Sequence, residues 1–318
     1  MDFKYLYFGS SSFSLLVLEN LIKNNCFPSI VVTSPPKAQG RKMILTPNPL
    51  ETFSKNNHLK VLTPSSLSEK NFLEEIEKTK ADFSLLAGYG KIIPPYLLNL
   101  FPYGFLNLHP SLLPKYRGAT PIQSAILNGE RETGVTLFKM NEKMDEGPII
   151  SQIKIEVAPE MTKGELEKIL AEKAVELFLR TIPLYLKNQI SLIPQDEKLA
   201  TYCFKFKPED EKIIWEKPVK EIDQKVKAFN PQPGVYTEIL DQKNQILRIK
   251  IIKGSPLFDP LLEKEKKPGT IINFQNHFAV KCLDGLYLLE IIKPASKKEM
   301  KASDFLRGNP WLINQKFI

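Results

Sequence analysis

An asparagine and a histidine, Asn107 and His109, stand two positions apart in LNLHPSLLPKYRGATPI (residues 106–122), at the end of a predicted strand. Side chains two apart on a strand face the same side, so both polar groups should point into one crevice. Pro110 keeps His109 out of helical geometry, and Gly118 permits the chain to turn back. The pair can donate hydrogen bonds to an oxyanion, and the imidazole can transfer a proton. The alternative is a histidine that only caps a strand end in a rigid loop.

A carboxylate further along the chain completes this pair. Asp145 lies in MDEGPII (residues 144–150), in a loop between two predicted strands, and can reach a histidine at a neighbouring strand end. Asn, His and Asp together suit acyl transfer to an amine without a covalent intermediate, with Asp145 accepting the proton of the attacking ammonium directly or through water. No cysteine lies nearby to act as a nucleophile. Ser111 lacks the GxSxG elbow, and we interpret it as part of the turn.

These residues need a sheet to position them. Strands alternate with helices along the first 190 residues, which predicts an α/β fold: a doubly wound, mostly parallel sheet with helices on both faces. Ligands bind such sheets beyond the carboxyl ends of the strands. The predicted strands are 4–8, 29–34, 61–63, part of 81–90, 104–109, 133–140 and 148–157, and the clearest helices are about 10–23 and 162–186.

The pattern changes after Gln189. A polar, proline-punctuated stretch is followed by a helix at 218–230 and by short alternating strands at 246–252, 269–274, 277–283 and 285–292. Several short strands within about 100 residues indicate a small β-barrel. We therefore expect a catalytic domain at 1–190, a linker at 191–206 and a C-terminal domain at 207–318.

Composition limits the function classes. The 318 residues carry a net charge of +8, and residues 201–318 hold 21 Lys and Arg against 15 Asp and Glu. A basic surface favours polyanions, although an ordinary lysine-rich surface has the same composition. Three dispersed cysteines argue for a reducing compartment and against disulfides or a structural zinc. We read the N-terminus as strand, turn and helix rather than an export signal, and no apolar run is long enough to span a membrane.

Residues 33–50, TSPPKAQGRKMILTPNPL, form an insertion with four prolines and the cations Lys37, Arg41 and Lys42. We expect a long loop without regular structure. Such loops are uncommon in compact domains and often functional, the alternative being a tolerated surface excursion.

The stretch FLNLHPSLLPKYRGATPIQSAILNGERETGVTLFKMNEKMDEGPI (residues 105–149) resembles the core of the 10-formyltetrahydrofolate-dependent formyltransferases. The resemblance extends to FGSSSF, LLAGYGKIIP, KAFNPQPGVY and LLEIIKPASKKEMKASDFLRG. It implies a Rossmann-like formyltransferase domain joined to a barrel resembling an OB-fold. It also implies formyl transfer from 10-formyltetrahydrofolate to the amino group of methionine on initiator tRNA, with no metal.

Site residues carry over by position. The resemblance implies that Asn107, His109 and Asp145 are catalytic and that Lys37, Arg41 and Lys42 contact tRNA. It implies a folate-binding set made of Ser111, Leu112, Leu113, Pro114, Tyr89, Gly90, Ile92 and Pro94.

Two alternatives stay open. Formyltransferases that act on amino-sugar nucleotides share the core and can share a similar C-terminal barrel. A relative that binds RNA without catalysis is a second alternative, against which the intact Asn107, His109 and Asp145 stand. A dinucleotide-binding protein fits poorly, since no GxGxxG follows the first strand. The basic insertion and basic C-terminal half favour an RNA substrate, which needs distributed phosphate contacts. We expect a cytoplasmic monomer.

Overall fold

The computed structural model describes residues 3–39 and 43–318. Contacts between residues divide the chain into two compact units, which we describe one at a time. The first comprises Met1–Pro121, Glu132–Glu156 and Glu167–Phe204, and the second comprises Ile122–Arg131, Val157–Leu166 and Lys205–Ile318. Among the described residues, no helix combines the length and the apolar character needed to cross a bilayer.

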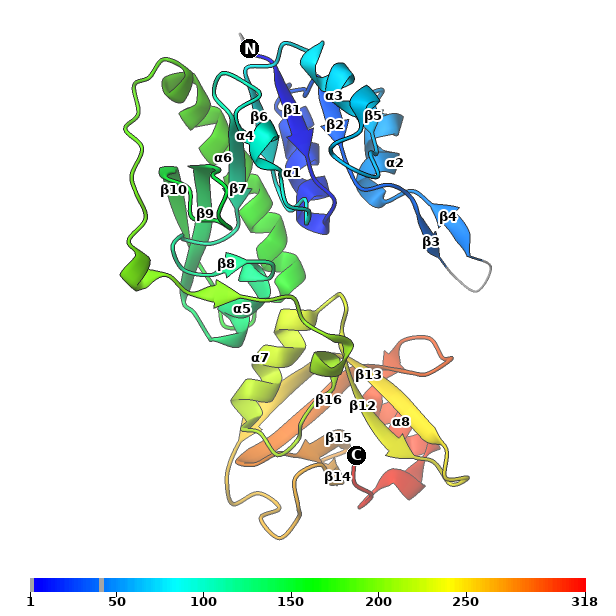
Figure 1. The fold of residues 1–318 in the computed structure, drawn as a ribbon. Coiled ribbons are helices and arrows are strands. Elements are labelled where there is room, and N and C mark those ends of the chain that lie inside the picture. Colours follow the sequence, from blue (N-terminus) through cyan, green and yellow to red (C-terminus); the bar gives the residue numbers. More distant parts are fainter. Residues whose placement is uncertain (1–2, 40–42) are drawn as a thin grey trace. The chain divides into compact units, whose positions relative to one another are not determined.

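The first unit is built on a seven-stranded sheet in which five neighbouring strands are parallel (Figure 1). Its spatial order is β10 (Ile149–Glu156), β9 (Glu132–Lys139), β7 (Phe105–His109), β6 (Phe83–Leu86), β1 (Tyr5–Phe8), β2 (Ile30–Val32) and β5 (Val61–Leu62). The pairs β7–β9 and β9–β10 are antiparallel. The prediction of a mostly parallel α/β sheet is thereby confirmed.

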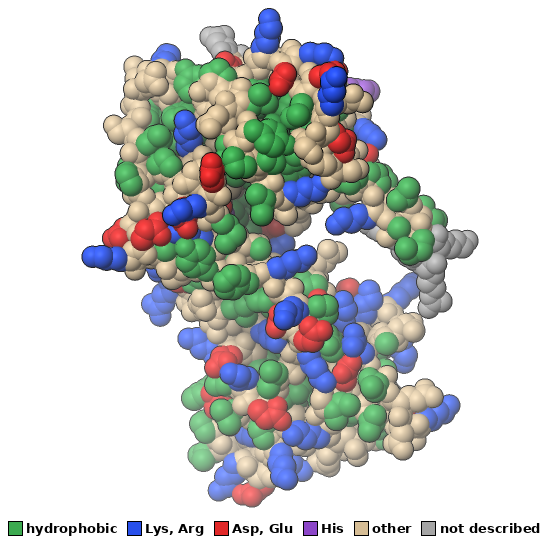
Figure 2. Space-filling view, viewed as in Figure 1, with side chains coloured by type: hydrophobic (Ala, Val, Ile, Leu, Met, Phe, Trp, Pro, Cys, Tyr) green, Lys and Arg blue, Asp and Glu red, His purple; other side chains and the backbone are tan. Residues whose placement is uncertain are grey.

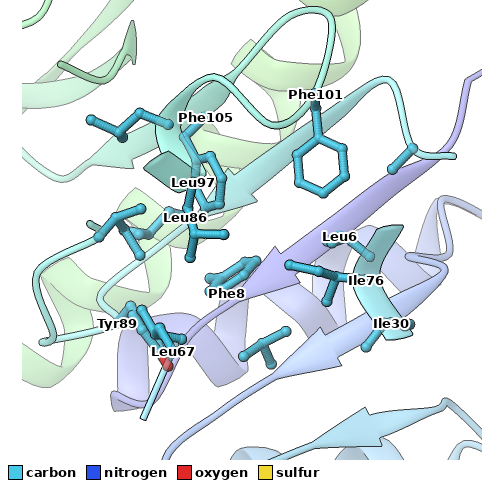
Figure 3. Packing of buried hydrophobic residues seen from close by; sticks show 14 of the residues in the cluster. Leu6, Phe8, Ile30, Leu67, Ile76, Leu86, Tyr89, Leu97, Phe101 and Phe105 are labelled. Carbon is cyan, nitrogen blue, oxygen red and sulfur yellow. The ribbon is translucent and has the colours of Figure 1, made fainter. Parts of the chain in front are cut away.

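Alternation along β1 explains how helices cover both faces of this sheet. Leu6 and Phe8 point into a buried cluster with α3 (Lys70–Glu77) and α4 (Pro95–Leu98) (Figure 3). Tyr5 and Tyr7 point the other way, toward α1 (Ser12–Lys23) and α6 (Lys163–Leu186): the Tyr7 hydroxyl donates to the Ser14 carbonyl at 2.7 Å, and the Tyr5 ring lies 6.0 Å from that of Phe178. Each face is therefore sealed by apolar side chains that the period of two supplies.

The insertion differs from its expected form. Instead of a loop without regular structure, it forms a β-hairpin of β3 (Lys37–Gln39) and β4 (Ile44–Thr46), which projects from the first unit (Figure 1). Helix α2 (Pro49–Asn56) follows at once, with Asn48 as its N-cap. Met43, Ile44 and Leu45 are exposed near the hairpin's end. The pairs Lys37–Thr46, Ala38–Leu45 and Gln39–Ile44 join the two strands.

The second unit contains an antiparallel sheet in the order β12 (Val235–Leu240), β13 (Ile246–Phe258), β16 (Gly285–Pro294), β15 (His277–Lys281) and β14 (Ile271–Phe274), with β17 (Met300–Lys301) also paired to β16. The predicted four strands are present, and β12 and β17 are additional ones. Its helices are α5 (Pro121–Leu127), α7 (Val219–Phe229) and α8 (Ala302–Gly308).

The last residues of the chain bridge the two outer strands of this sheet. The amide of Ile271 at the start of β14 donates to the Gln315 carbonyl at 2.8 Å, and the amide of Ile318 donates to the Glu238 carbonyl of β12 at 2.8 Å. Phe317 lies between these contacts, is only 3% exposed and stacks on Trp215 and Phe278. The C-terminal segment thus joins one edge of the sheet to the other and makes the unit barrel-like.

The stretch expected to be a linker is part of the first unit. Within it, β11 (Tyr202–Cys203) pairs in parallel with β8 (Arg117–Gly118), directly after the PSLLPKY segment. Ile193 bridges to Ile149 in β10. Backbone hydrogen bonds hold residues 193–204 to the first unit, and the last segment of the second unit begins at Lys205.

Candidate active site

Asn107 and His109 lie on β7 in the middle of the sheet. Asn107 pairs with Leu86 of β6 on one side and Phe138 of β9 on the other, and His109 pairs with Thr136 of β9. Since the two residues are two apart, their side chains leave the sheet on the same face. They are 6% and 5% exposed, so the surrounding chain fixes both groups in place.

Asp145 reaches this strand end from the turn between β9 and β10. Its backbone adopts a left-handed conformation with φ of +55°, which Asp tolerates better than most residues. Oδ2 of its carboxylate accepts a 2.8 Å hydrogen bond from the amide of Gly118 and lies 3.6 Å from Nδ1 of His109. The latter distance is that of an ion pair or a close approach rather than a direct hydrogen bond. The structure therefore brings Asp145 to the imidazole as the sequence predicts.

The bonding of the remaining polar atoms leaves room for a bound molecule. Nε2 of His109 lies 2.8 Å from the Tyr116 carbonyl, which only accepts, so Nε2 carries a proton and Nδ1 is the nitrogen that faces Asp145. Oδ1 of Asn107 is buried and has no partner within the described protein. An unpaired buried acceptor costs about 1–3 kcal/mol. A ligand that donates a hydrogen bond to Oδ1 would remove this cost, so the unpaired atom is typical of a binding site.

The segment Ser111–Pro114 is fastened by side chains of β9 and β10. The Thr136 hydroxyl donates to the Ser111 carbonyl at 2.7 Å and accepts from the Leu113 amide at 3.0 Å, while Gln152 Nε2 donates to the Leu113 carbonyl at 2.8 Å. These backbone groups of Ser111 and Leu113 are therefore bonded within the protein and not open to a ligand. They instead hold the segment rigid.

The residues after β6 occupy two different environments. Tyr89 lies in the apolar core, edge-on to Phe8, and burial raises its pKa to about 12 (Figure 3). Its hydroxyl is buried without a partner in the described protein. Ile92 is 89% exposed, and Gly90 adopts φ of +73°. Pro94 caps α4.

Arg117 is the main residue of this region to which the sequence did not draw attention. It is fully buried, and both of its terminal nitrogens donate to the Glu197 carboxylate, at 2.9 and 2.8 Å. These hydrogen bonds hold the pKa of Arg117 above its ordinary range. Glu146, beside Asp145, lies 3.6 Å from the same guanidinium. An isolated arginine next to a glycine belongs to no sequence motif, so its buried contact with Glu197 could not be predicted from the sequence.

The cations expected to contact RNA are only partly visible. Lys37 is exposed on β3, whereas Arg41 and Lys42 lie outside the described residues. On the second unit, Figure 2 shows Lys and Arg side chains interspersed with Asp and Glu rather than gathered in one stripe. The net positive charge is therefore spread over this face.

A Rossmann-like sheet with Asn, His and Asp meeting at one strand end is an arrangement suited to an enzyme that transfers an acyl group. Residues 3–182 match the family model described as formyl transferase, and residues 205–310 match its C-terminal domain. The chain belongs to the formyl transferase family. Its curated relatives include the methionyl-tRNA formyltransferase of Carboxydothermus hydrogenoformans, 37% identical over 99% of each chain, and that of Halalkalibacterium halodurans, 36% identical over 96% of this chain and 94% of the relative.

Solved structures share the fold at lower identity. One is HypX from Aquifex aeolicus in complex with tetrahydrofolic acid, with a TM-score of 0.64, 18% identity, and coverage of 96% of this chain and 47% of that one. Another is the N-formyltransferase from Helicobacter canadensis in complex with folinic acid and dTDP-3-aminofucose, with a TM-score of 0.63, 22% identity, and coverage of 94% and 100%.

Proposed function

We propose that this enzyme transfers the formyl group of 10-formyltetrahydrofolate to the amino group of methionine on initiator tRNA. The observation that carries the proposal is the meeting of Asn107, His109 and Asp145 at one strand end. Relatives named for this reaction, similar along nearly the whole chain, support the choice of substrate. The reaction belongs where translation starts, which places it in the cytoplasm.

In this proposal the donor supplies a formyl group bound to nitrogen, and the protein supplies charge stabilisation and proton transfer. Asn107 donates a hydrogen bond from its side-chain amide to the formyl oxygen as negative charge grows on it. His109 donates to the same oxygen through a proton on Nδ1, since Nε2 already donates to the Tyr116 carbonyl. Asp145 orients His109 and accepts, directly or through water, the proton that the amine loses. The amine attacks the formyl carbon directly, the bond from that carbon to the folate nitrogen breaks, and His109 gives the leaving nitrogen a proton. No enzyme side chain becomes acylated.

The amine itself needs only modest help. An α-amino group titrates near pH 7.7–8.0 in model peptides, and the neighbouring ester of aminoacyl-tRNA lowers this further. Much of the substrate is therefore neutral near pH 7, so the site needs to remove a proton after attack rather than before it. A partly exposed carboxylate such as Asp145 suits that task.

We further propose that the folate lies beside Ser111, Leu112, Leu113 and Pro114, bordered by Tyr89, Gly90, Ile92 and Pro94. Two observations support the fit. The segment from Ser111 to Pro114 is braced beside His109, and the unpaired Oδ1 of Asn107 can accept a donor from the bound molecule.

Lys37, Arg41 and Lys42 are proposed to contact phosphates of the tRNA, together with the basic second unit. A paired hairpin can carry such cations further from the sheet than a collapsed loop can. An amino-sugar nucleotide is the second candidate substrate, favoured by the fold shared with the Helicobacter canadensis enzyme.

One assay separates these substrates. The protein is mixed with isotopically labelled 10-formyltetrahydrofolate and offered methionyl-initiator tRNA, uncharged initiator tRNA or dTDP-3-aminofucose. We expect label only on the methionyl-tRNA. Label on the sugar nucleotide instead would replace the proposed substrate, and tight tRNA binding with no label anywhere would point to a relative that binds RNA without catalysis.

A further inference from the structure

A glutamine from the segment expected to be a linker contacts the turn that carries Asp145. Nε2 of Gln195 donates to the carbonyl of Asp145 at 2.7 Å and to the carbonyl of Gly147 at 2.8 Å. Its Oε1 accepts from Arg117, from Nε at 3.1 Å and from a terminal nitrogen at 2.9 Å. Both donors and both acceptor positions of the carboxamide are thus in use.

The orientation of this amide is dictated by its neighbours. Guanidinium groups only donate and backbone carbonyls only accept, so the oxygen must face Arg117 and the nitrogen must face the turn. Arg117 is itself immobilised by the Glu197 carboxylate and by the Tyr202 hydroxyl at 3.1 Å. Gln195 therefore ties the turn to a fixed, buried group.

The turn that carries Asp145 needs contacts of this kind to hold it in place. Residues 141–144 are exposed, and Asp145 adopts a left-handed backbone conformation. The carboxylate of Asp145 is placed from its far end by the Gly118 amide, next to Arg117 in the chain. Asp145 is thus held at two points. The Gly118 amide, which follows Arg117 in the chain, holds the carboxylate. Gln195, which is bonded to Arg117, holds the backbone carbonyl.

We propose that Gln195 is a positioning residue for Asp145: through its carboxamide it sets the distance between the Asp145 carboxylate and the His109 imidazole. The inference rests on the catalytic role proposed above for Asp145. Gln195 sits in a segment whose neighbours 191–194 and 196–199 are exposed, so its side chain contributes little to the core.

Two substitutions test this. Gln195→Glu keeps the acceptors for Arg117 but replaces the donor with an oxygen, which the Asp145 and Gly147 carbonyls repel. Gln195→Met removes the hydrogen bonds without adding charge. If Gln195→Glu lowers the melting temperature, the activity of Gln195→Met is the one to compare with that of the parent. Gln189→Glu makes the same chemical change on an exposed side chain and serves as the control. We expect kcat to fall about 10- to 100-fold in both Gln195 variants, because small misplacements of a reacting group are costly.

A merely structural role is excluded by two further measurements. KM for both substrates should stay within about twofold of the parent, since only the proton-transfer geometry changes. In an Asp145→Asn background, Gln195→Met should lower kcat by less than about twofold, because two residues acting through one another are not additive. Equal losses in both backgrounds, or full activity of the Gln195 variants, would overturn the inference alone. An Asp145→Asn enzyme with near-normal turnover would overturn both the inference and the proposed role of Asp145.

Discussion

The carboxylate of Asp145 lies 3.6 Å from the imidazole of His109, although one residue ends a central strand and the other occupies an exposed turn. The Gly118 amide holds Oδ2 of Asp145 at 2.8 Å, so the carboxylate cannot swing toward solvent without breaking that bond. The proposed chemistry depends on this approach.

Asp145→Asn and His109→Ala should each lower turnover by about 100-fold or more while the protein stays folded. Asn keeps the shape of Asp145 but cannot accept a proton, and Ala removes both a donor and the proton carrier. Single-turnover formylation measures the effect. Near-normal turnover of Asp145→Asn would remove this residue from the mechanism.

Gly118→Ala should impair both folding stability and catalysis. Gly118 has φ of +117°, and a Cβ atom there would lie 2.2 Å from the Cys203 carbonyl oxygen. The chain must shift, and the amide that holds Asp145 shifts with it. We expect a fall in kcat of about 10-fold or more, as for other misplaced catalytic groups. Gly308→Ala, where nothing lies within 4 Å of the added atom, is the matched control. Equal activity of the two variants would contradict the prediction.

Replacing Arg41 and Lys42 with alanine should weaken tRNA binding and reduce the slope of log K against log salt by about 0.7–0.9 for each phosphate that the protein no longer neutralises. Titrations at several salt concentrations measure the slope. The double variant Lys23→Ala/Lys70→Ala removes the same charge from exposed helix positions. If both double variants give the parent slope, the hairpin takes no part in binding.

Phe317→Ala should destabilise the second unit by about 3–5 kcal/mol, because it removes a buried ring between Trp215 and Phe278. Both tryptophans, Trp215 and Trp311, belong to this unit, so tryptophan fluorescence during urea unfolding reports on it. Ile318→Ala changes the adjacent side chain, which is 54% exposed, and should cost far less. Equal effects would mean that the tail does not depend on its aromatic contact.

Acid should destabilise the second unit partly through Glu238. Hydrogen bonds from Arg248, and then from Lys212, hold the pKa of Glu238 below its usual range. A depressed native pKa adds stability above the unfolded value of about 4.3 and loses it as pH falls toward the native value. Glu238→Gln should therefore lower the urea midpoint at pH 7 and flatten its decline between about pH 5 and pH 3. The exposed Glu265→Gln should leave that decline unchanged.

Long, periodic elements could be predicted from the sequence, and short ones could not. The strand ending in His109 and the helix over 163–186 carry their own hydrophobic pattern, so their positions followed from local residues. Strands β8 and β11 have two residues each and exist only because they pair with each other across the chain. No local period reveals such pairing.

The candidate site divides in the same way. Asn107, His109 and Asp145 have side chains whose chemistry suggests a role, and strand alternation places the first two together. Gln195 lies in a polar, proline-containing stretch that is typical of a linker. Its contacts with the Asp145 turn depend on tertiary structure, as do those of Thr136 with Ser111 and Leu113.

The pairing of β11 with β8 also bears on where an N-terminal fragment of the protein should end. A fragment ending near residue 190, where the composition changes, would retain the three candidate catalytic side chains but lack Gln195 and the partner strand of Arg117–Gly118. A fragment that keeps Gln195 and the β8–β11 pair must therefore extend to Phe204, immediately before the matched C-terminal domain begins.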